Sequence, residues 1–304
     1  MEVSVVGFGA WEAGGDAWGP NESDERVVEA MHAGLDAGMN WIDTAEVYGK
    51  GVSERIVGKA VADRRDAAFV FTKVAPSSEG SGFRPDQVRE AIRASLGRLG
   101  LDFVDLYQLH WPDETGIPVE ETWGTMVALR DEGLARYVGV SNFDRALIER
   151  CEPIGRVDSV QNEYSLLIQG DRREFLPWLA ERDIAYLAYS PMAAGILTGA
   201  IRADHVFRDD DWRSGRRDPD EEHPEMFRPG AFEENVSKAD RLGELAEKLG
   251  TTTATLALAW VVASSPNTLA IAGSRSPEHA RSNAAAGERD LDPDVLAEID
   301  AIFG

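Results

Sequence analysis

The alternation of short apolar runs with longer amphipathic stretches constrains this chain more than any other feature of its sequence. The short runs are apolar almost throughout, as expected of strands in a sheet that is buried on both faces. We therefore predict strands at residues 3–9, 41–43, 69–73, 103–109, 137–140, 159–161, 185–189 and 268–272.

The longer stretches have the spacing of helices that bury one face. In the stretch 85–99, Val88, Ile92 and Leu96 recur on one helical face. Pro85 and Gly100 stand where helices commonly begin and end, and Asn21 is predicted to cap the first helix. Helices are predicted at residues 24–37, 53–62, 85–99, 119–132, 144–152, 174–182, 233–249, 253–264, 277–286 and 293–303.

A strand followed by a helix, repeated about eight times, predicts a parallel sheet. Alternation alone fits a doubly wound open sheet as well as a closed barrel. The number of units, and the lack of G-x-G-x-x-G after the first strand, favour a (β/α)8 TIM barrel with residues 1–304 in a single domain. The polar segment 202–230 follows the seventh strand, and we expect a long loop over the barrel mouth. A loose surface insertion is the alternative.

The charge of the chain bears on its partners and its host. A net charge of −23 disfavours binding to nucleic acid or to anionic membranes. No apolar run approaches the roughly 20 residues of a membrane-spanning helix, and no signal peptide is visible. Cys151 is the only cysteine, so we expect a cytoplasmic protein. Abundant carboxylates with scarce lysine fit a high-salt cytoplasm or a GC-rich genome, and the oligomeric state stays open.

Four side chains that could take part in catalysis lie at or just after three consecutive predicted strands. Asp43 ends one strand and Tyr48 follows shortly after it, Lys73 ends the next strand, and His110 directly follows the third. The C-terminal ends of barrel strands converge at one mouth. Singly, each residue has an ordinary structural explanation, as a cap, a surface lysine, a packed ring or a structural histidine. Together they predict one active site.

A single chemical role suits this set. A tyrosine has an unperturbed pKa of about 10 and is a poor acid at neutral pH. A nearby lysine ammonium stabilises the phenolate and is expected to lower that pKa. An aspartate keeps the lysine charged, and a neutral histidine orients a substrate oxygen. The set is suited to protonating a carbonyl oxygen while its carbon is reduced.

Short blocks of sequence, in a fixed order along the chain, carry a family resemblance. They are residues 38–49 with Ser53 and Glu54, then 72–74, 99–102, 105–112, 139–143, 161–165, 188–191 and 271–275. Over essentially the whole chain they resemble the aldo-keto reductase family, and residues 7–11 are most similar to a bacterial branch of general stress and sugar-oxidising reductases. The resemblance implies a barrel that binds a nicotinamide dinucleotide without a Rossmann motif, with Tyr48 as the general acid.

The resemblance also implies positions for the nicotinamide end of the cofactor. Ser141, Asn142 and Gln161 would hold the carboxamide, and Tyr189, with Ser190 beside it, would lie against the ring. The alternative for the first three is ordinary hydrogen bonding at strand ends. For Tyr189 the alternative is core packing.

At the adenosine end, Ser274 and Arg275 resemble the family's contacts to the 2′-phosphate of NADP. Arginine suits a phosphate by its charge and fork geometry, and a helix start at Ser276 would add backbone N–H groups. His279 and Asn283 would line the adenosine pocket. An arginine on a solvated loop is the alternative reading of Arg275. We expect NADP on the basis of Ser274 and Arg275. NAD is possible because the chain departs from the usual family pattern at Ala272, His279 and Ser282.

Several functions compete for this sequence. The leading prediction is NADPH-dependent reduction of an aldehyde or ketone, and the same residues would serve a sugar or alcohol dehydrogenase working in the oxidative direction. A low-turnover redox sensor that only holds the cofactor is a further alternative. A metal-dependent hydrolase would need several ligands at strand ends, where His110 is the only histidine, so no metal is expected. Trp11, Trp18 and Trp111 are candidate walls for a carbonyl or sugar substrate.

Overall fold

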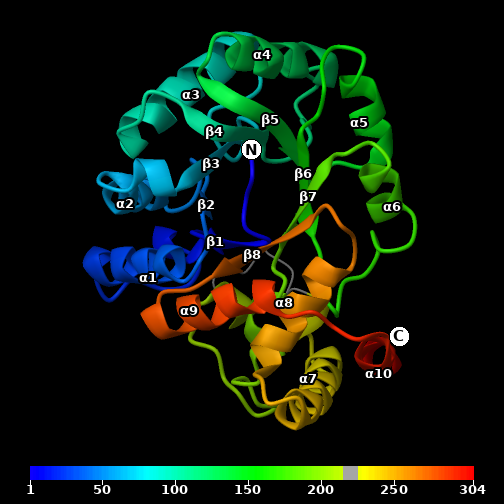
Figure 1. Ribbon diagram of the computed structural model, residues 1–304. Coiled ribbons are helices and arrows are strands. Elements are labelled where there is room, and N and C mark those ends of the chain that lie inside the picture. Colours follow the sequence, from blue (N-terminus) through cyan, green and yellow to red (C-terminus); the bar gives the residue numbers. More distant parts are fainter. Residues whose placement is uncertain (215–224) are drawn as a thin grey trace.

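The computed structural model describes residues 1–214 and 225–304, and its strands close into one parallel barrel. Neighbouring strands pair in sequence order, and the last strand returns to pair with the first (Figure 1). The strands are β1 (Val6–Gly9), β2 (Trp41–Asp43), β3 (Phe69–Val74), β4 (Val104–Leu109), β5 (Ala135–Ser141), β6 (Ser159–Glu163), β7 (Ala185–Tyr189) and β8 (Thr268–Gly273). The predicted (β/α)8 barrel is confirmed, and the open sheet is excluded.

Helices form a ring around this barrel (Figure 1). They are α1 (Asp24–Asp36), α2 (Val52–Val61), α3 (Pro85–Leu99), α4 (Val119–Asp131), α5 (Arg145–Cys151), α6 (Phe175–Ala180), α7 (Ala231–Lys248), α8 (Thr253–Ala263), α9 (Pro277–Ala285) and α10 (Pro293–Phe303). Each lies where the sequence predicts a helix. Within the described residues, no helix is long and apolar enough to cross a membrane.

The first helix is capped by a different residue from the one predicted. The Ser23 hydroxyl accepts a hydrogen bond from the backbone N–H of Arg26 at 3.2 Å. Asn21 instead donates from Nδ2 to the carbonyl of Ala13 at 2.7 Å. The predicted cap at Asn21 is wrong because a capping side chain must directly precede the first helical residue to reach the second or third free N–H.

The two-residue period of the strands sorts side chains into two cores. On β2, Trp41 belongs to a small apolar cluster inside the barrel, whereas Ile42 packs in the layer between strands and helices. Gly7 makes room for the inner indole, because a Cβ at this position would lie 2.1 Å from Cε2 of Trp41. The next inward residue after Trp41 is Asp43. Apolar rings therefore fill the floor of the barrel, and the polar inward residues lie above them, nearer the mouth.

The N-terminal segment closes the floor of the barrel from below. The indole N–H of Trp41 donates to the carbonyl of Ser4 at 2.8 Å, and the terminal amino group of Met1 donates to the hydroxyl of Tyr137 at 3.0 Å. Figure 1 accordingly shows the N-terminus inside the ring of strands, close to β4 and β5. The opposite end of the barrel is the end available for a ligand.

The described part of the long connection after β7 lies against the β1–α1 connection at the mouth. The backbone N–H of Trp212 donates to the carbonyl of Ala17 at 3.0 Å, and its ring centroid lies 5.5 Å from that of Trp11 and 5.7 Å from that of Trp18. Asp211, Trp212 and Arg213 therefore lie at the mouth, where the loop was predicted to lie. Residues 215–224 of the predicted loop lie outside the described residues.

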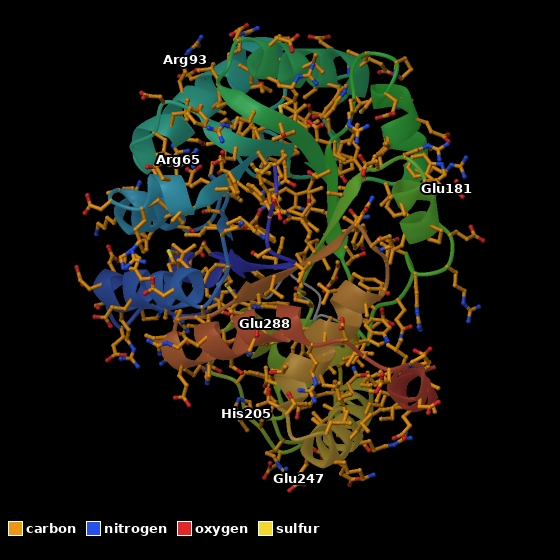
Figure 2. The ribbon with its side chains drawn as sticks, in the orientation of Figure 1. Arg65, Arg93, Glu181, His205, Glu247 and Glu288 are labelled. Atoms are coloured by element: carbon orange, nitrogen blue, oxygen red, sulfur yellow. The ribbon has the colours of Figure 1, made fainter. Side chains whose placement is uncertain are left out.

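Charged side chains gather on the outer surface of the helical ring. Figure 2 shows Arg93, Glu181 and Glu247 at the outer margin of the molecule, and all three are exposed. The few ionisable groups inside the barrel therefore stand in a different environment from the acidic exterior.

Candidate active site

A cavity of about 890 Å³ opens at the C-terminal ends of the strands. Its volume falls at the upper end of the roughly 300–1,000 Å³ of small-molecule sites. All of the site residues predicted from the sequence line this cavity, with the exception of Lys73. Lys73 is fully buried at the end of β3.

Lys73 is fixed by three contacts. Its Nζ lies 2.5 Å from Oδ1 of Asp43, 2.9 Å from the carbonyl of Thr44 and 3.3 Å from the hydroxyl of Tyr48. An ammonium has three N–H donors, so these contacts use all of them. The predicted grouping of Asp43, Tyr48 and Lys73 is present in the structure.

Amide side chains hold the second oxygen of Asp43. Its Oδ2 accepts hydrogen bonds from Nε2 of Gln161 at 3.0 Å and from Nε2 of Gln108 at 3.4 Å. Gln108 was not predicted from the sequence, although it precedes His110 by two residues on β4 and so shares the inward parity of that strand. The carboxylate is thereby aimed at Lys73 from two further strands.

The pKa of Tyr48 shifts in the opposite direction from the one predicted. Burial raises the pKa of the phenol, and this effect outweighs the lowering by the Lys73 ammonium. Burial lowers the pKa of Lys73, but the Asp43 carboxylate and Tyr48 together raise it above its ordinary value. The resting site therefore holds a protonated phenol beside a charged ammonium. The ammonium stabilises the phenolate once it forms, rather than in the resting state.

His110 is neutral in this site. Burial, with a further contribution from Lys73, lowers the pKa of His110 well below its ordinary value. Its ring stacks on Trp111 with centroids 3.8 Å apart and meets the Tyr48 ring edge to face at 5.6 Å. Its buried Nδ1 has no hydrogen-bond partner among the described residues. A neutral imidazole beside the phenol is suited to a hydrogen bond with a substrate oxygen.

The residues predicted to hold the nicotinamide are hydrogen-bonded to one another and to strand-end carbonyls on the cavity wall. Asn142 has a φ of 60°, which asparagine tolerates, and its Nδ2 donates to the carbonyl of His110 at 2.9 Å. The hydroxyl of Tyr189 donates to Oδ1 of Asn142 at 2.9 Å, and Oγ of Ser141 donates to the carbonyl of Gln161 at 2.7 Å. These side chains therefore make ordinary hydrogen bonds at strand ends, as the alternative predicts, and they also line the cavity. Ser190 lines the cavity beside them.

The far end of the cavity lies between β8 and the start of α9. Ser274, Arg275, His279 and Asn283 all line it. The Ser276 hydroxyl caps α9 by accepting from the backbone N–H of His279 at 3.5 Å. Arg275 is not a free surface arginine, because its Nη atoms donate to carbonyls of the β1–α1 connection.

Three charged residues of the cavity were not predicted as site residues. They are Glu12, Glu79 and Arg213. Glu12 follows β1 and so occupies the same kind of position as the predicted residues, which is a signal that was present in the sequence. Arg213 lies in the long connection after β7, and its placement at the mouth depends on packing that no local pattern encodes. Its guanidinium is paired with the carboxylate of Asp211 at 2.6 Å.

The sequence matches a known protein family over nearly its whole length. The aldo/keto reductase family pattern matches residues 5–303. The chain belongs to the aldo/keto reductase family. It is accordingly an NAD(P)H-dependent oxidoreductase that acts on carbonyl or alcohol groups, as members of this family are.

Two curated members of the aldo/keto reductase family illustrate its range. The chain is 34% identical to the aldo-keto reductase YhdN of Bacillus subtilis (strain 168) over 91% of this chain and 83% of that protein. It is 31% identical to the NADH-specific methylglyoxal reductase of Escherichia coli (strain K12) over 94% of this chain and 90% of that protein.

Solved structures agree with the fold, and one of them contains NADP. The glycerol dehydrogenase of Gluconobacter oxydans matches with a TM-score of 0.87 and 31% identity, covering 99% of this chain and 92% of that one. An aldo/keto reductase of Klebsiella pneumoniae in complex with NADP and acetate matches with a TM-score of 0.77 and 30% identity, with the same coverage.

Proposed function

We propose that the protein is an NADP(H)-dependent carbonyl reductase in which Tyr48 is the general acid. The observation that carries this proposal is the 3.3 Å contact between the Lys73 ammonium and the Tyr48 hydroxyl on a cavity wall shared with His110. The phenol is protonated at rest, and the phenolate that it leaves behind is stabilised by a fixed cation. Tyr48 is therefore suited to donate a proton to a carbonyl oxygen.

The chain's own residues supply everything except the hydride. A reduced nicotinamide, when bound, supplies that hydride to the carbonyl carbon. Tyr48 donates its proton to the carbonyl oxygen, and Lys73 stabilises the phenolate left behind. Neutral His110 hydrogen-bonds the same oxygen and orients it. Asp43 keeps Lys73 charged and in place.

The cavity fits a nicotinamide dinucleotide along its length. Tyr189, Ser190, Ser141, Asn142 and Gln161 would hold the nicotinamide end beside Tyr48. The cation of Arg275 and the capped N-terminus of α9 suit the phosphates, and Ser274, His279 and Asn283 would complete the adenosine end. We propose NADP as the main cofactor and NAD as a second one, and the NADP complex from Klebsiella pneumoniae supports this order.

The substrate is proposed to be a small uncharged aldehyde, ketone or sugar. Trp11, Trp18 and Trp111 line the cavity beside Tyr48. Lys73, which contacts the Tyr48 hydroxyl, is engaged with Asp43, and Arg213, which lines the cavity, is paired with Asp211. An anionic substrate would therefore meet no free cation beside Tyr48 among the described residues. The same residues run the reverse oxidation of an alcohol or sugar.

We also propose a cytoplasmic location for this enzyme. Its single cysteine, Cys151, is buried, and burial raises the pKa of the thiol to about 12. Such a thiol is inert toward oxidation, and a nicotinamide-dependent reductase is suited to a reducing compartment.

The experiment that tests this function is the Tyr48→Phe variant. We expect it to bind NADPH as the wild type does, measured by quenching of tryptophan fluorescence, while kcat for aldehyde reduction falls by roughly 10³. The phenyl ring keeps the packing but has no proton to donate.

A wild-type protein that binds NADPH and reduces no member of a broad aldehyde and ketone panel would instead favour the redox-sensor alternative. If Tyr48→Phe retained most of its kcat, another proton donor would have to be sought.

A further inference from the structure

Glu12 has a carboxylate that accepts no hydrogen bond within the described residues. It lies in the short 3-10 turn (Glu12–Gly14) that follows β1, and its side chain is only 25% exposed. It lines the cavity, and its one ion-pair contact there is a long one, to Arg275. A partly buried carboxylate on a cavity wall with unfilled hydrogen-bond acceptors is available to a ligand.

The position of this carboxylate places it at the cofactor end of the cavity. Its Oε1 would lie 3.0 Å from a Cβ built on Gly273, the last residue of β8. Its Oε2 lies 3.9 Å from Nε of Arg275. Burial raises the pKa of Glu12, and the positive charges of Arg275 and Arg213 oppose this shift.

Arg275 uses most of its hydrogen-bond donors on the protein itself. Its Nη1 donates to the carbonyls of Gly19 at 3.1 Å and Pro20 at 3.2 Å, and its Nη2 donates to the carbonyl of Trp18 at 3.2 Å. A guanidinium has five N–H donors, so among the described contacts the N–H on Nε and one N–H on Nη2 remain for a phosphate. The Nε atom is also the one that lies 3.9 Å from the Glu12 carboxylate.

We infer that Glu12 lowers the preference of this enzyme for NADP(H) over NAD(H), by placing a negative charge beside Arg275 where the 2′-phosphate of NADP(H) would bind. The inference rests on the proposed cofactor site. An acidic side chain repels that phosphate but accepts a hydrogen bond from the ribose hydroxyl of NAD(H). Glu12 is thus a specificity-determining residue with no part in proton transfer.

The test is the affinity of Glu12→Gln for ligands that differ by one phosphate. Dissociation constants of NADPH and NADH are measured by tryptophan fluorescence, and that of adenosine 2′-monophosphate by calorimetry. We expect the ratio of NADPH to NADH affinity to rise roughly tenfold in the variant, the scale of removing one charge beside a phosphate in a partly solvated groove. Adenosine 2′-monophosphate is expected to bind more tightly as well.

Glu22→Gln is the matched control, because it removes the same charge from the same β1–α1 connection at a side chain that is 77% exposed. It is expected to leave the affinity ratio unchanged. An unchanged ratio in Glu12→Gln, or an equal rise in Glu22→Gln, overturns the role of Glu12 and leaves the proposed function intact. A wild-type protein that binds neither dinucleotide overturns both.

Discussion

Burial sets the protonation of the two groups that face the substrate position. Tyr48 and His110 both keep their neutral forms, since desolvation raises the pKa of the phenol and lowers that of the imidazole. Lys73 remains charged because Asp43 compensates for its burial. One cation beneath two neutral hydrogen-bonding groups is an arrangement that stabilises negative charge only as it develops on a substrate oxygen.

The neutrality of His110 has a consequence for stability. Its pKa in the folded protein lies below the unfolded value of about 6.5. Below that pH the unfolded chain binds a proton that the folded chain does not, so stability falls as pH decreases, by up to roughly 1 kcal/mol per pH unit. This component should be absent from His110→Gln. Urea unfolding of both proteins at pH 7 and pH 5 measures it, and a stability difference that does not change with pH would contradict the assignment.

The sequence predicted these residues better than it predicted their chemistry. Asp43, Lys73 and His110 were recognisable because strand ends in a barrel share one mouth. The direction of the Tyr48 pKa shift was not recognisable from the sequence, because it depends on how completely the phenol is desolvated. Glu12 and Arg213 both line the cavity, but only the position of Glu12 after β1 was a signal in the sequence, since Arg213 is brought there by the packing of the long connection after β7.

At the scale of elements, a buried carboxylate joins α2, α3 and β3 behind the site. Oε1 of Glu54 accepts from the Thr72 hydroxyl at 2.7 Å, and its Oε2 accepts from Nε of Arg98 at 2.5 Å. Thr72 points outward between Phe71 and Lys73 on β3, so this contact anchors the strand that carries the lysine. The alternation of the strand thus couples helix packing outside the barrel to the position of Lys73 inside it.

Replacing Glu54 by Gln should destabilise the fold by about 3 kcal/mol, because it removes one partner of a buried ion pair and leaves the Arg98 guanidinium uncompensated. Equilibrium urea unfolding, followed by circular dichroism, measures the loss. Glu90→Gln on the exposed side of α3 is the control and should change stability by less than about 0.5 kcal/mol. Similar losses in the two variants would show that the buried pair contributes little.

Elements were predictable where one local pattern decides them and uncertain where several compete. All eight strands were found because each is a short apolar run, and α3 was found with its exact bounds because Pro85 and Gly100 mark its ends. The cap of α1 was misassigned because Asn21 and Ser23 both qualify by residue type. Their hydrogen bonds to Ala13 and Arg26 are settled by tertiary packing of the β1–α1 connection.

At the scale of the whole molecule, repulsion between acidic side chains destabilises the folded state at low salt. The chain carries a net charge of −23, and the exterior helices present the exposed acidic side chains visible in Figure 2. Ion pairs such as Arg150 with Glu120 and Arg89 with Glu132 offset part of this repulsion. Acidic residues remain in excess, since lysine and arginine together number 31 against 54 acidic residues. Compaction therefore holds like charges closer together than they are in the unfolded chain.

Salt should therefore stabilise this protein. We expect Tm to rise when KCl is increased from about 0.01 M to 1 M, with most of the gain reached by roughly 0.2 M, where the Debye length falls below about 8 Å and exposed like charges no longer interact across the surface. Scanning calorimetry measures the rise. Sucrose at matched osmolality is the control, because it favours the compact state without screening charge. Equal gains in sucrose and in KCl, or a Tm that falls with KCl, would show that self-repulsion of the acidic surface is not what limits stability at low salt.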